Sequence, residues 1–284
     1  MNRIKGIIRG LTPPFAWALM KKCFKSKNAD EKCDPKKSFV KGDFFCPVCG
    51  KMVLNFLPLP IYYQEMKEKY PPIRKKTLGE TMNRHAYSCP NCGESDRNRL
   101  YAMYLSNKFE EMRETRKQYS FLDLAPSIPL QKFIKSYDFI QYRSADLYMD
   151  NVDDKVDIMN MNIYSDDQFD IILCSHMLEH VEDDRKAMAE LYRVLNPSGF
   201  AIIMVPIDLM LDADFEDKSI VSESDRWRYF GQGDHVRAYS KNGFVNKLKE
   251  TGFVVHQYDE AYFGKWEFYN KGINPHSVLY VVTK

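Results

Sequence analysis

The sequence predicts an α/β fold, in which helices cover a mostly parallel sheet of seven strands and a small cysteine-bearing unit precedes the sheet. Short apolar runs alternate with helix-period segments after residue 119, a pattern typical of parallel sheets. Acidic residues stand at or just past the ends of three successive apolar runs, and two Cys-x-x-Cys pairs lie ahead of the first run. The 284 residues suffice for one such domain and a small appendage.

The expected strands and helices follow from these runs. The strands span residues 121–124, 139–145, 156–159, 169–173, 200–205, 253–258 and 278–283. The helices cover 94–118, 128–136, 183–195 and 239–251, and Asn196–Gly199 and Gly252 provide two helix stop signals. The first of these helices begins with Asp96-Arg97-Asn98-Arg99, which is either a surface face or a wall of a cleft. We favour the surface.

Charge divides the chain into two regimes. Residues 1–118 carry 24 Lys and Arg against 12 Asp and Glu, whereas residues 119–284 carry 17 against 27. The basic half suits nucleic acid, an anionic membrane or phosphorylated substrates as a neighbour, or else it docks on the acidic half of its own chain. Residues 1–22 mix apolar and basic side chains, so they form an amphipathic segment on a membrane surface, a helix packed on the protein or a loose terminus.

Seven cysteines, four of them in two pairs, favour a reducing compartment and a metal over disulfides. The pairs are Cys46-Pro-Val-Cys49-Gly and Cys89-Pro-Asn-Cys92-Gly, and four thiolates in two tight turns suit tetrahedral zinc with no open position. The intervening stretch exceeds the usual ribbon spacing of about 15–20 residues, so we expect an insertion at about 57–81. Zn2+ held by these four cysteines would be structural.

These features give three units: an N-terminal helix and linker at 1–43, a zinc ribbon with an insertion at 44–93, and the α/β domain at 94–284. The sequence contains neither an apolar run of 18 residues nor an evident signal peptide. We therefore expect a cytoplasmic protein, with peripheral membrane contact through residues 1–22 as one interpretation.

Asp123, Asp146 and Asp157 follow successive apolar runs. In open α/β sheets ligands bind outside the carboxyl ends of the strands, so these carboxylates are expected to line one crevice. Asp146 lies 23 positions after Asp123, close to the spacing of about 20 residues that ribose recognition requires. A nucleoside-containing ligand is therefore expected.

With these features the chain resembles a Rossmann-like class I S-adenosylmethionine-dependent methyltransferase (type 11-like). A bacterial subgroup linked to surface-glycan synthesis joins a zinc ribbon to such a domain, and Phe230–Tyr239 is similar to it. One departure is that the turn after the first strand reads Ala125-Pro126-Ser127 where most relatives have glycines. The residues that carry the wider resemblance are Leu122–Pro126, Asp146, Asp157–Met161, Phe169–Ile172, Leu178–Val181, Glu190–Gly199 and Val205–Pro206.

The resemblance implies roles for particular residues. Asp123 and Ala125 would lie near the methionine end of S-adenosylmethionine, Asp146 and Leu147 at the ribose, and Asp157 and Ile158 at the adenine. Cys174 and Ser175 would line the methionine and the transfer path. For each aspartate the alternative is a helix cap or a turn residue.

Methyl transfer to a hydroxyl requires proximity and usually a base, and histidine is the natural base near neutral pH. His176 follows the fourth strand and His235 lies in a later loop, so either is a candidate base or a polar wall residue. Arg237 could hold an acceptor's phosphate or carboxylate. His180 is as readily structural as functional.

Three functions compete. The first is O-methylation of a sugar, glycan or related small-molecule acceptor. The second is RNA base methylation, with the basic zinc unit as an RNA clamp, although no clear pattern of stacking aromatic residues accompanies the basic residues. The third is a non-catalytic binding module whose ribbon recruits a partner, which the three aspartates make the weakest interpretation.

Overall fold

The computed structural model describes residues 44–74 and 76–284, and its centre is a six-stranded sheet. The order β4-β3-β5-β6-β10-β9 places β3 between β4 and β5. The first four strands in this order run parallel, whereas β10 is antiparallel to both of its neighbours. The strands are β3 (Tyr119–Leu124), β4 (Ile140–Ala145), β5 (Phe169–Ser175), β6 (Leu195–Met204), β9 (Val254–Tyr258) and β10 (Leu279–Thr283).

The prediction of seven strands was wrong at residues 156–159. The chain there forms a turn, in which the Asp157 carboxylate accepts the Met159 amide at 2.8 Å and the Asp157 carbonyl accepts the Asn160 amide. An isolated bridge between Ala145 and Asp154 is the remaining parallel contact at this edge. Aspartate turn chemistry thus prevails over a short apolar run.

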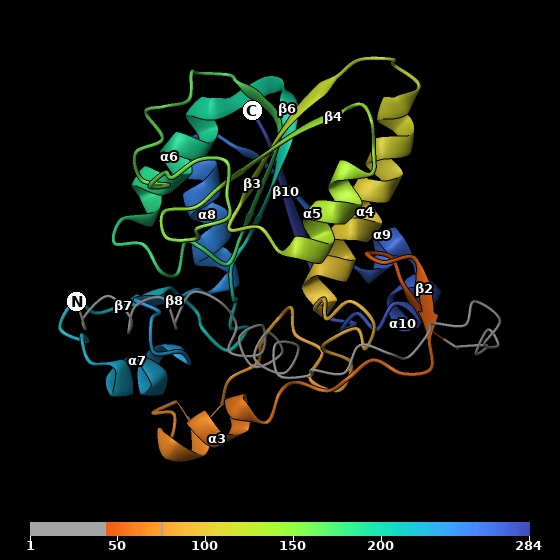
Figure 1. Ribbon diagram of the computed structural model, residues 1–284. Coiled ribbons are helices and arrows are strands. Elements are labelled where there is room, and N and C mark those ends of the chain that lie inside the picture. The colour runs from red at the N-terminus through yellow and green to blue at the C-terminus, as the bar shows by residue number, and fades with distance from the viewer. Residues whose placement is uncertain (1–43, 75) are drawn as a thin grey trace.

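Two pairs of helices cover the two faces of the sheet (Figure 1). One pair is α4 (Asp96–Arg113) and α5 (Ile128–Lys135), and the other is α6 (Asp184–Val194) and α8 (Lys241–Thr251). Side-chain caps start α4, α6 and α8 at Ser95, Asp183 and Ser240. Gly252, with a φ of 113°, ends α8 as its sequence predicts. Because helices bury both faces, residues 171–174 of β5 and 201–204 of β6 are apolar and buried.

The cysteine-bearing unit consists of the hairpin β1 (Phe44–Cys46) and β2 (Lys51–Val53) and the following segment, which includes α3 (Tyr62–Lys69). Arg99 of α4 is fully buried and anchors this unit, since its guanidinium stacks 3.8 Å from the centre of the Phe56 ring. It also donates to the carbonyls of residues 86, 87, 94, 271 and 272. The last two lie just beyond α10 (Lys265–Asn270), which follows α9 (Glu260–Phe263).

The segment between the two cysteine pairs crosses the carboxyl edge of the sheet. The Glu80 amide donates to the Ile207 carbonyl just after β6, and the Tyr280 hydroxyl donates to the Glu80 carboxylate at 2.8 Å. Lys241 also pairs with Glu80 at 3.0 Å. Figure 1 shows α3 and α7 (Glu223–Phe230) beneath this edge. We call residues 57–88 the crossing segment.

A short two-stranded ladder, β7 (Phe215–Glu216) with β8 (Arg237–Ala238), completes this end of the molecule. The N-terminal helix and linker predicted at 1–43 lie outside the described residues. Across the part of the chain that the structure describes, the search for a helix long and apolar enough to cross a bilayer found none.

Candidate active site

The strand order reverses at β3, because β4 and β5 lie on opposite sides of it. In open α/β sheets ligands bind outside the carboxyl ends of the strands at such a point, and we call this region the crevice. The residues that follow β3 and β5 both have left-handed backbone: Ala125 has a φ of 53° and His176 a φ of 55°. Such a conformation costs a residue with a Cβ roughly 1–2 kcal/mol and is often found at functional sites. Alanine thus adopts at the first turn the conformation that glycine takes without strain.

The carboxyl half of β3 contains a buried carboxylate. Asp123 is 2% exposed, and it accepts a hydrogen bond from the Tyr142 hydroxyl at 2.7 Å. Burial raises the pKa of Asp123 from its ordinary 3.8 to about 7, although Tyr142 offsets part of the effect. A neighbouring cation would favour the ionised form, so this position suits a positively charged ligand.

The raised pKa predicts that Asp123→Asn stabilises the fold at alkaline pH. Between pH 4 and 7 the folded chain retains a proton that the unfolded chain releases, so the wild type loses stability as pH rises through this range. Three pKa units correspond to about 4 kcal/mol as an upper bound. We expect a gain of a few kcal/mol in the free energy of unfolding at pH 8 and little at pH 4, measured by urea titration.

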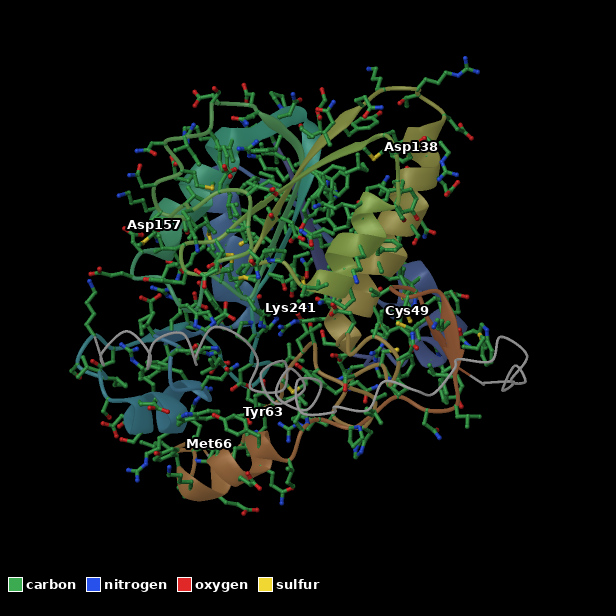
Figure 2. The ribbon with its side chains drawn as sticks, in the orientation of Figure 1. Cys49, Tyr63, Met66, Asp138, Asp157 and Lys241 are labelled. Carbon is green, nitrogen blue, oxygen red and sulfur yellow. The ribbon has the colours of Figure 1, made fainter. Side chains whose placement is uncertain are left out.

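Asp138→Asn is the matched control, because Asp138 is exposed and lies at the opposite end of the sheet (Figure 2). It should leave the free energy of unfolding unchanged at both pH values. An Asp123→Asn protein that is less stable than the wild type at pH 8 would contradict the claim that the ionised Asp123 carboxylate destabilises the fold.

The turn after β4 holds Asp146 in place through one of its oxygens. Oδ1 accepts the amides of Tyr148 and Met149 at 2.6 and 2.7 Å. Within the described chain Oδ2 has no hydrogen-bond partner, so it remains free for a ligand. Leu147 is 42% exposed beside it, whereas Ile158 is buried. Asp157 is half-buried and its Oδ1 accepts the Met159 amide, as described above.

The end of β5 brings together residues from distant parts of the chain. Cys174 is fully buried, and burial raises the pKa of its thiol. The Ser175 hydroxyl lies 2.8 Å from the hydroxyl of Tyr101 on α4. Tyr101 was not among the predicted site residues, although its spacing of four from Arg97 places both on one face of a helix.

The expectation that residues 96–99 face solvent was wrong. Asp96 and Arg99 are almost fully buried, and Arg97 has a buried Nε without a hydrogen-bond partner. Arg97 lies close enough to His176 to contribute to the lowering of its pKa, and it acts likewise on Tyr63 of α3. The start of α4 therefore faces His176 and α3, in agreement with the alternative of a cleft wall, and Arg97 is a candidate anion-binding residue.

Three histidines surround one carboxylate. Glu179 is fully buried, and its Oε1 lies 3.2 Å from His176 Nδ1, 3.8 Å from His180 Nε2 and 4.0 Å from His235 Nε2. Burial lowers the pKa of His176 to about 4 and that of His235 to about 3, so both imidazoles are neutral at pH 7. Burial acts to raise the pKa of the Glu179 carboxyl, whereas hydrogen bonding from His176 acts to lower it.

The two predicted candidate bases thus meet at one carboxylate that the sequence analysis left without a role. The signal was present in the string His176-x-x-Glu179-His180, which combines general-base and ligand residue types at close spacing. His176 is the more accessible of the two bases, with 13% of its side chain exposed against 3% for His235.

Arg237 does not face an acceptor, which corrects the role expected for it. Its side chain is 2% exposed and donates to Glu216 at 2.9 Å and to the carbonyls of Leu178, Val181 and Glu182. These bonds occupy each of its three nitrogens. Arg237 therefore supports the loop that carries Glu179 and His180.

The four paired cysteines form one cluster. The distance between the Sγ atoms is 3.8 Å for Cys46 and Cys92 and 3.9 Å for Cys49 and Cys89, and all four lie within 4.8 Å of one another. Gly50 and Gly93, with φ of 66° and 82°, close the two turns. In Figure 2 Cys49 and Asp157 lie on opposite sides of the molecule, so the cysteine cluster is separate from the crevice.

Carboxylates after successive strands at a topological switch point are typical of nucleoside-binding α/β folds. A family model described as a methyltransferase domain matches residues 106–258, more than half of the chain. The chain belongs to this methyltransferase family and is an S-adenosylmethionine-dependent methyltransferase.

Solved structures give distant likenesses, and a comparison with curated proteins gave no match. The [4+2]-cyclase SpnF is 13% identical over 65% of this chain and 80% of its own, with a TM-score of 0.39. Protein PH0226 from Pyrococcus horikoshii is 18% identical over 65% and 91%, with a TM-score of 0.42. Phosphoethanolamine N-methyltransferase 2 from Haemonchus contortus, in complex with S-adenosyl-L-methionine, is 17% identical over 54% and 38%, with a TM-score of 0.38. None of these identifies a substrate.

Proposed function

We propose that this methyltransferase transfers the methyl group to a hydroxyl oxygen of a sugar, glycan or related small acceptor. The observation that carries the proposal is a neutral imidazole, His176, beside a buried carboxylate at the end of β5. A hydroxyl acceptor needs a proton acceptor, whereas the crevice of an enzyme for already nucleophilic acceptors does not. Glu179 near Nδ1 orients the ring and leaves Nε2 without a protein partner.

The residues present fit S-adenosylmethionine, which supplies a methyl group on a sulfonium sulfur. We assign the ribose hydroxyls to the free Oδ2 of Asp146, next to Leu147, and the adenine to Asp157 and Ile158. Asp123 suits the cationic methionine end because no positively charged protein group stabilises its buried carboxylate. Ala125, Cys174 and Ser175 line the path between them, with Arg97 as a further partner for the methionine carboxylate.

In the proposed reaction, the acceptor oxygen forms a bond to the methyl carbon as the carbon–sulfur bond breaks. The hydroxyl proton passes to Nε2 of His176, and S-adenosylhomocysteine leaves. Tyr63 of the crossing segment and Tyr101 of α4 bound the acceptor's side of the crevice. The more buried His235 lies 4.0 Å from Glu179 Oε1 in the same cluster and is the second candidate base.

The cysteine cluster is proposed to hold a structural Zn2+. Ligands at the usual zinc–sulfur distance of about 2.3 Å in a tetrahedron are about 3.8 Å apart, which the two closest sulfur pairs match. The Asn91 side-chain amide donates to Cys49 Sγ at 3.2 Å, as expected around a thiolate. With four thiolates bound, the ion would have no position for a substrate.

The test uses full-length protein and methyl-labelled cofactor with separated cell fractions. Label is expected in the carbohydrate fraction as an alkali-stable O-methyl group. His176→Gln should lower the turnover number by about 10²–10⁴-fold while the affinity for S-adenosylmethionine stays within a few-fold. His256→Gln, an exposed histidine on β9, is the control and should retain full turnover.

Label in RNA instead would overturn the carbohydrate assignment in favour of RNA methylation. That second function draws on the basic residues of the N-terminal half. Several basic residues of the described part are paired or buried within the chain, for example Arg74 with Asp208 at 2.7 Å, so they add little to a nucleic-acid surface. Peripheral membrane contact through residues 1–22 stays a proposal that vesicle flotation would test.

A further inference from the structure

The cluster around Glu179 contains more polar groups than the methyl-transfer step uses. Seven of the twelve buried side-chain atoms that lack a hydrogen-bond partner in the described chain belong to it. They come from His176, Glu179, His180, Asp234 and His235. Buried polar groups are normally satisfied, so this concentration indicates a missing partner. A metal cation is one partner that satisfies a carboxylate oxygen and the lone pairs of imidazole nitrogens together.

We propose that Glu179, His180 and His235 bind a divalent transition-metal ion. One ligand atom from each of the three residues lies within 4.8 Å of the others, and Glu179 and His235 are almost fully buried. Ligands bound at about 2.1 Å to one ion are about 3–3.5 Å apart. The distances from Glu179 Oε1 to His180 Nε2 and His235 Nε2 are 3.8 and 4.0 Å, which exceed this range by about half an ångström.

The surrounding contacts orient the ligands as metal sites require. His180 approaches Glu179 through Nε2, and its other nitrogen, Nδ1, lies 3.4 Å from Asp234 Oδ2. A carboxylate on the second nitrogen of a metal-binding histidine fixes the ring and its tautomer. The rings of His180 and His235 are 86° apart, with centroids 4.7 Å apart, so both can point an edge at one ion without stacking.

The backbone holds the two ligand-bearing loops together. The Val236 amide donates to the Glu179 carbonyl at 2.9 Å, next to the ligand His235. Arg237, one residue further, binds the carbonyls of Leu178, Val181 and Glu182. These hydrogen bonds of the buried Arg237 fix the loop that carries His235 against the loop that carries Glu179 and His180.

The ligand set indicates the class of ion and its role. Two histidines and one carboxylate suit Zn2+, Fe2+ or Mn2+ and leave coordination positions open. His176 is not one of these three ligands and is more exposed than Glu179, so it stays available as the base. The ion's role rests on the proposed function: it would bind an acceptor with adjacent oxygen atoms and lower the pKa of its hydroxyl. The existence of the site does not depend on that function.

Metal binding is tested with Mn2+, which thiolate sites disfavour and carboxylate and imidazole ligands accept. The full-length protein is titrated with MnCl2, and the free ion is followed by electron paramagnetic resonance. We expect one Mn2+ per chain for the wild type. Glu179→Gln and His235→Gln should each weaken binding by at least about 100-fold, a larger loss than the 10–100-fold expected when only a residue that hydrogen-bonds to a ligand is changed. His276→Gln, an exposed histidine, is the matched control and should bind as the wild type does.

Two further measurements keep the outcome decisive. Calorimetry with S-adenosylmethionine on each variant establishes that it is folded, and His180→Gln replaces any variant that is not. A wild type that takes up neither Mn2+ nor Zn2+ beyond the cysteine site, or variants that bind like the wild type, overturns the metal site. Metal binding without methyl transfer to any hydroxyl acceptor leaves the site standing and refutes the proposed function instead.

Discussion

Asp146→Asn is expected to weaken S-adenosylmethionine binding by about 10–100-fold. Oδ1 holds the turn by accepting two amides, and asparagine can keep that role with its own oxygen. The free Oδ2 becomes an amide nitrogen, which cannot accept a ribose hydroxyl. A hydrogen bond to a charged group contributes about 1.5–3 kcal/mol, and this sets the expected loss. Isothermal calorimetry of full-length wild type and variant measures it.

Asp150→Asn is the control for this measurement, because Asp150 lies four residues further on and its side chain is 95% exposed. It should bind the cofactor as the wild type does. The two variants should also unfold within about 1 kcal/mol of the wild type, since the turn amides keep their acceptor. An Asp146→Asn protein with unchanged affinity would exclude this carboxylate from the cofactor site.

Cys46→Ser is expected to remove the metal and to destabilise the cysteine-bearing unit by several kcal/mol. Structural zinc contributes folding free energy directly, about 10–16 kcal/mol in small zinc-finger peptides. The loss here should be smaller than in those peptides, because Arg99 and the apolar core also stabilise the cysteine-bearing unit. Zinc content by mass spectrometry and thermal unfolding with and without a chelator measure both effects.

Cys33→Ser supplies a matched substitution, since Cys33 has no paired spacing in the sequence. It should retain one zinc per chain at the cysteine cluster. If the wild type as purified carries no zinc and a chelator leaves its melting temperature unchanged, the four thiols are unmetallated and the zinc proposal fails.

Much of the sheet could be predicted from local pattern, because buried parallel strands are continuous apolar runs. Strands β3, β4, β5, β6, β9 and β10 each overlap an expected strand. The expected strand at 156–159 failed because the Asp157 side chain satisfies local amides more readily than a distant strand could. The six-strand sheet therefore differs from expectation at its edge beyond β4.

The crevice was harder to predict, because its walls come from segments that only the fold brings together. Arg97 and Tyr101 lie some 75–80 positions before His176 and Ser175, and no periodic pattern connects them. The role of Arg237 was mispredicted for the same reason, because its carbonyl partners lie more than 50 residues earlier in the chain. Carboxylates at strand ends were visible in the sequence because sheet geometry determines where such ends meet.

The crossing segment has a consequence for how such enzymes diversify. It leaves the cysteine cluster, passes Arg97 through Tyr63 and returns to the cluster, while its bonds to the sheet edge come from Glu80, Arg74 and a few backbone groups. Because both ends are fixed at the cysteine turns, its interior can vary in length and composition without disturbing the strands. Selection can therefore change which molecules are methylated by exchanging this single stretch, while cofactor chemistry is inherited unaltered.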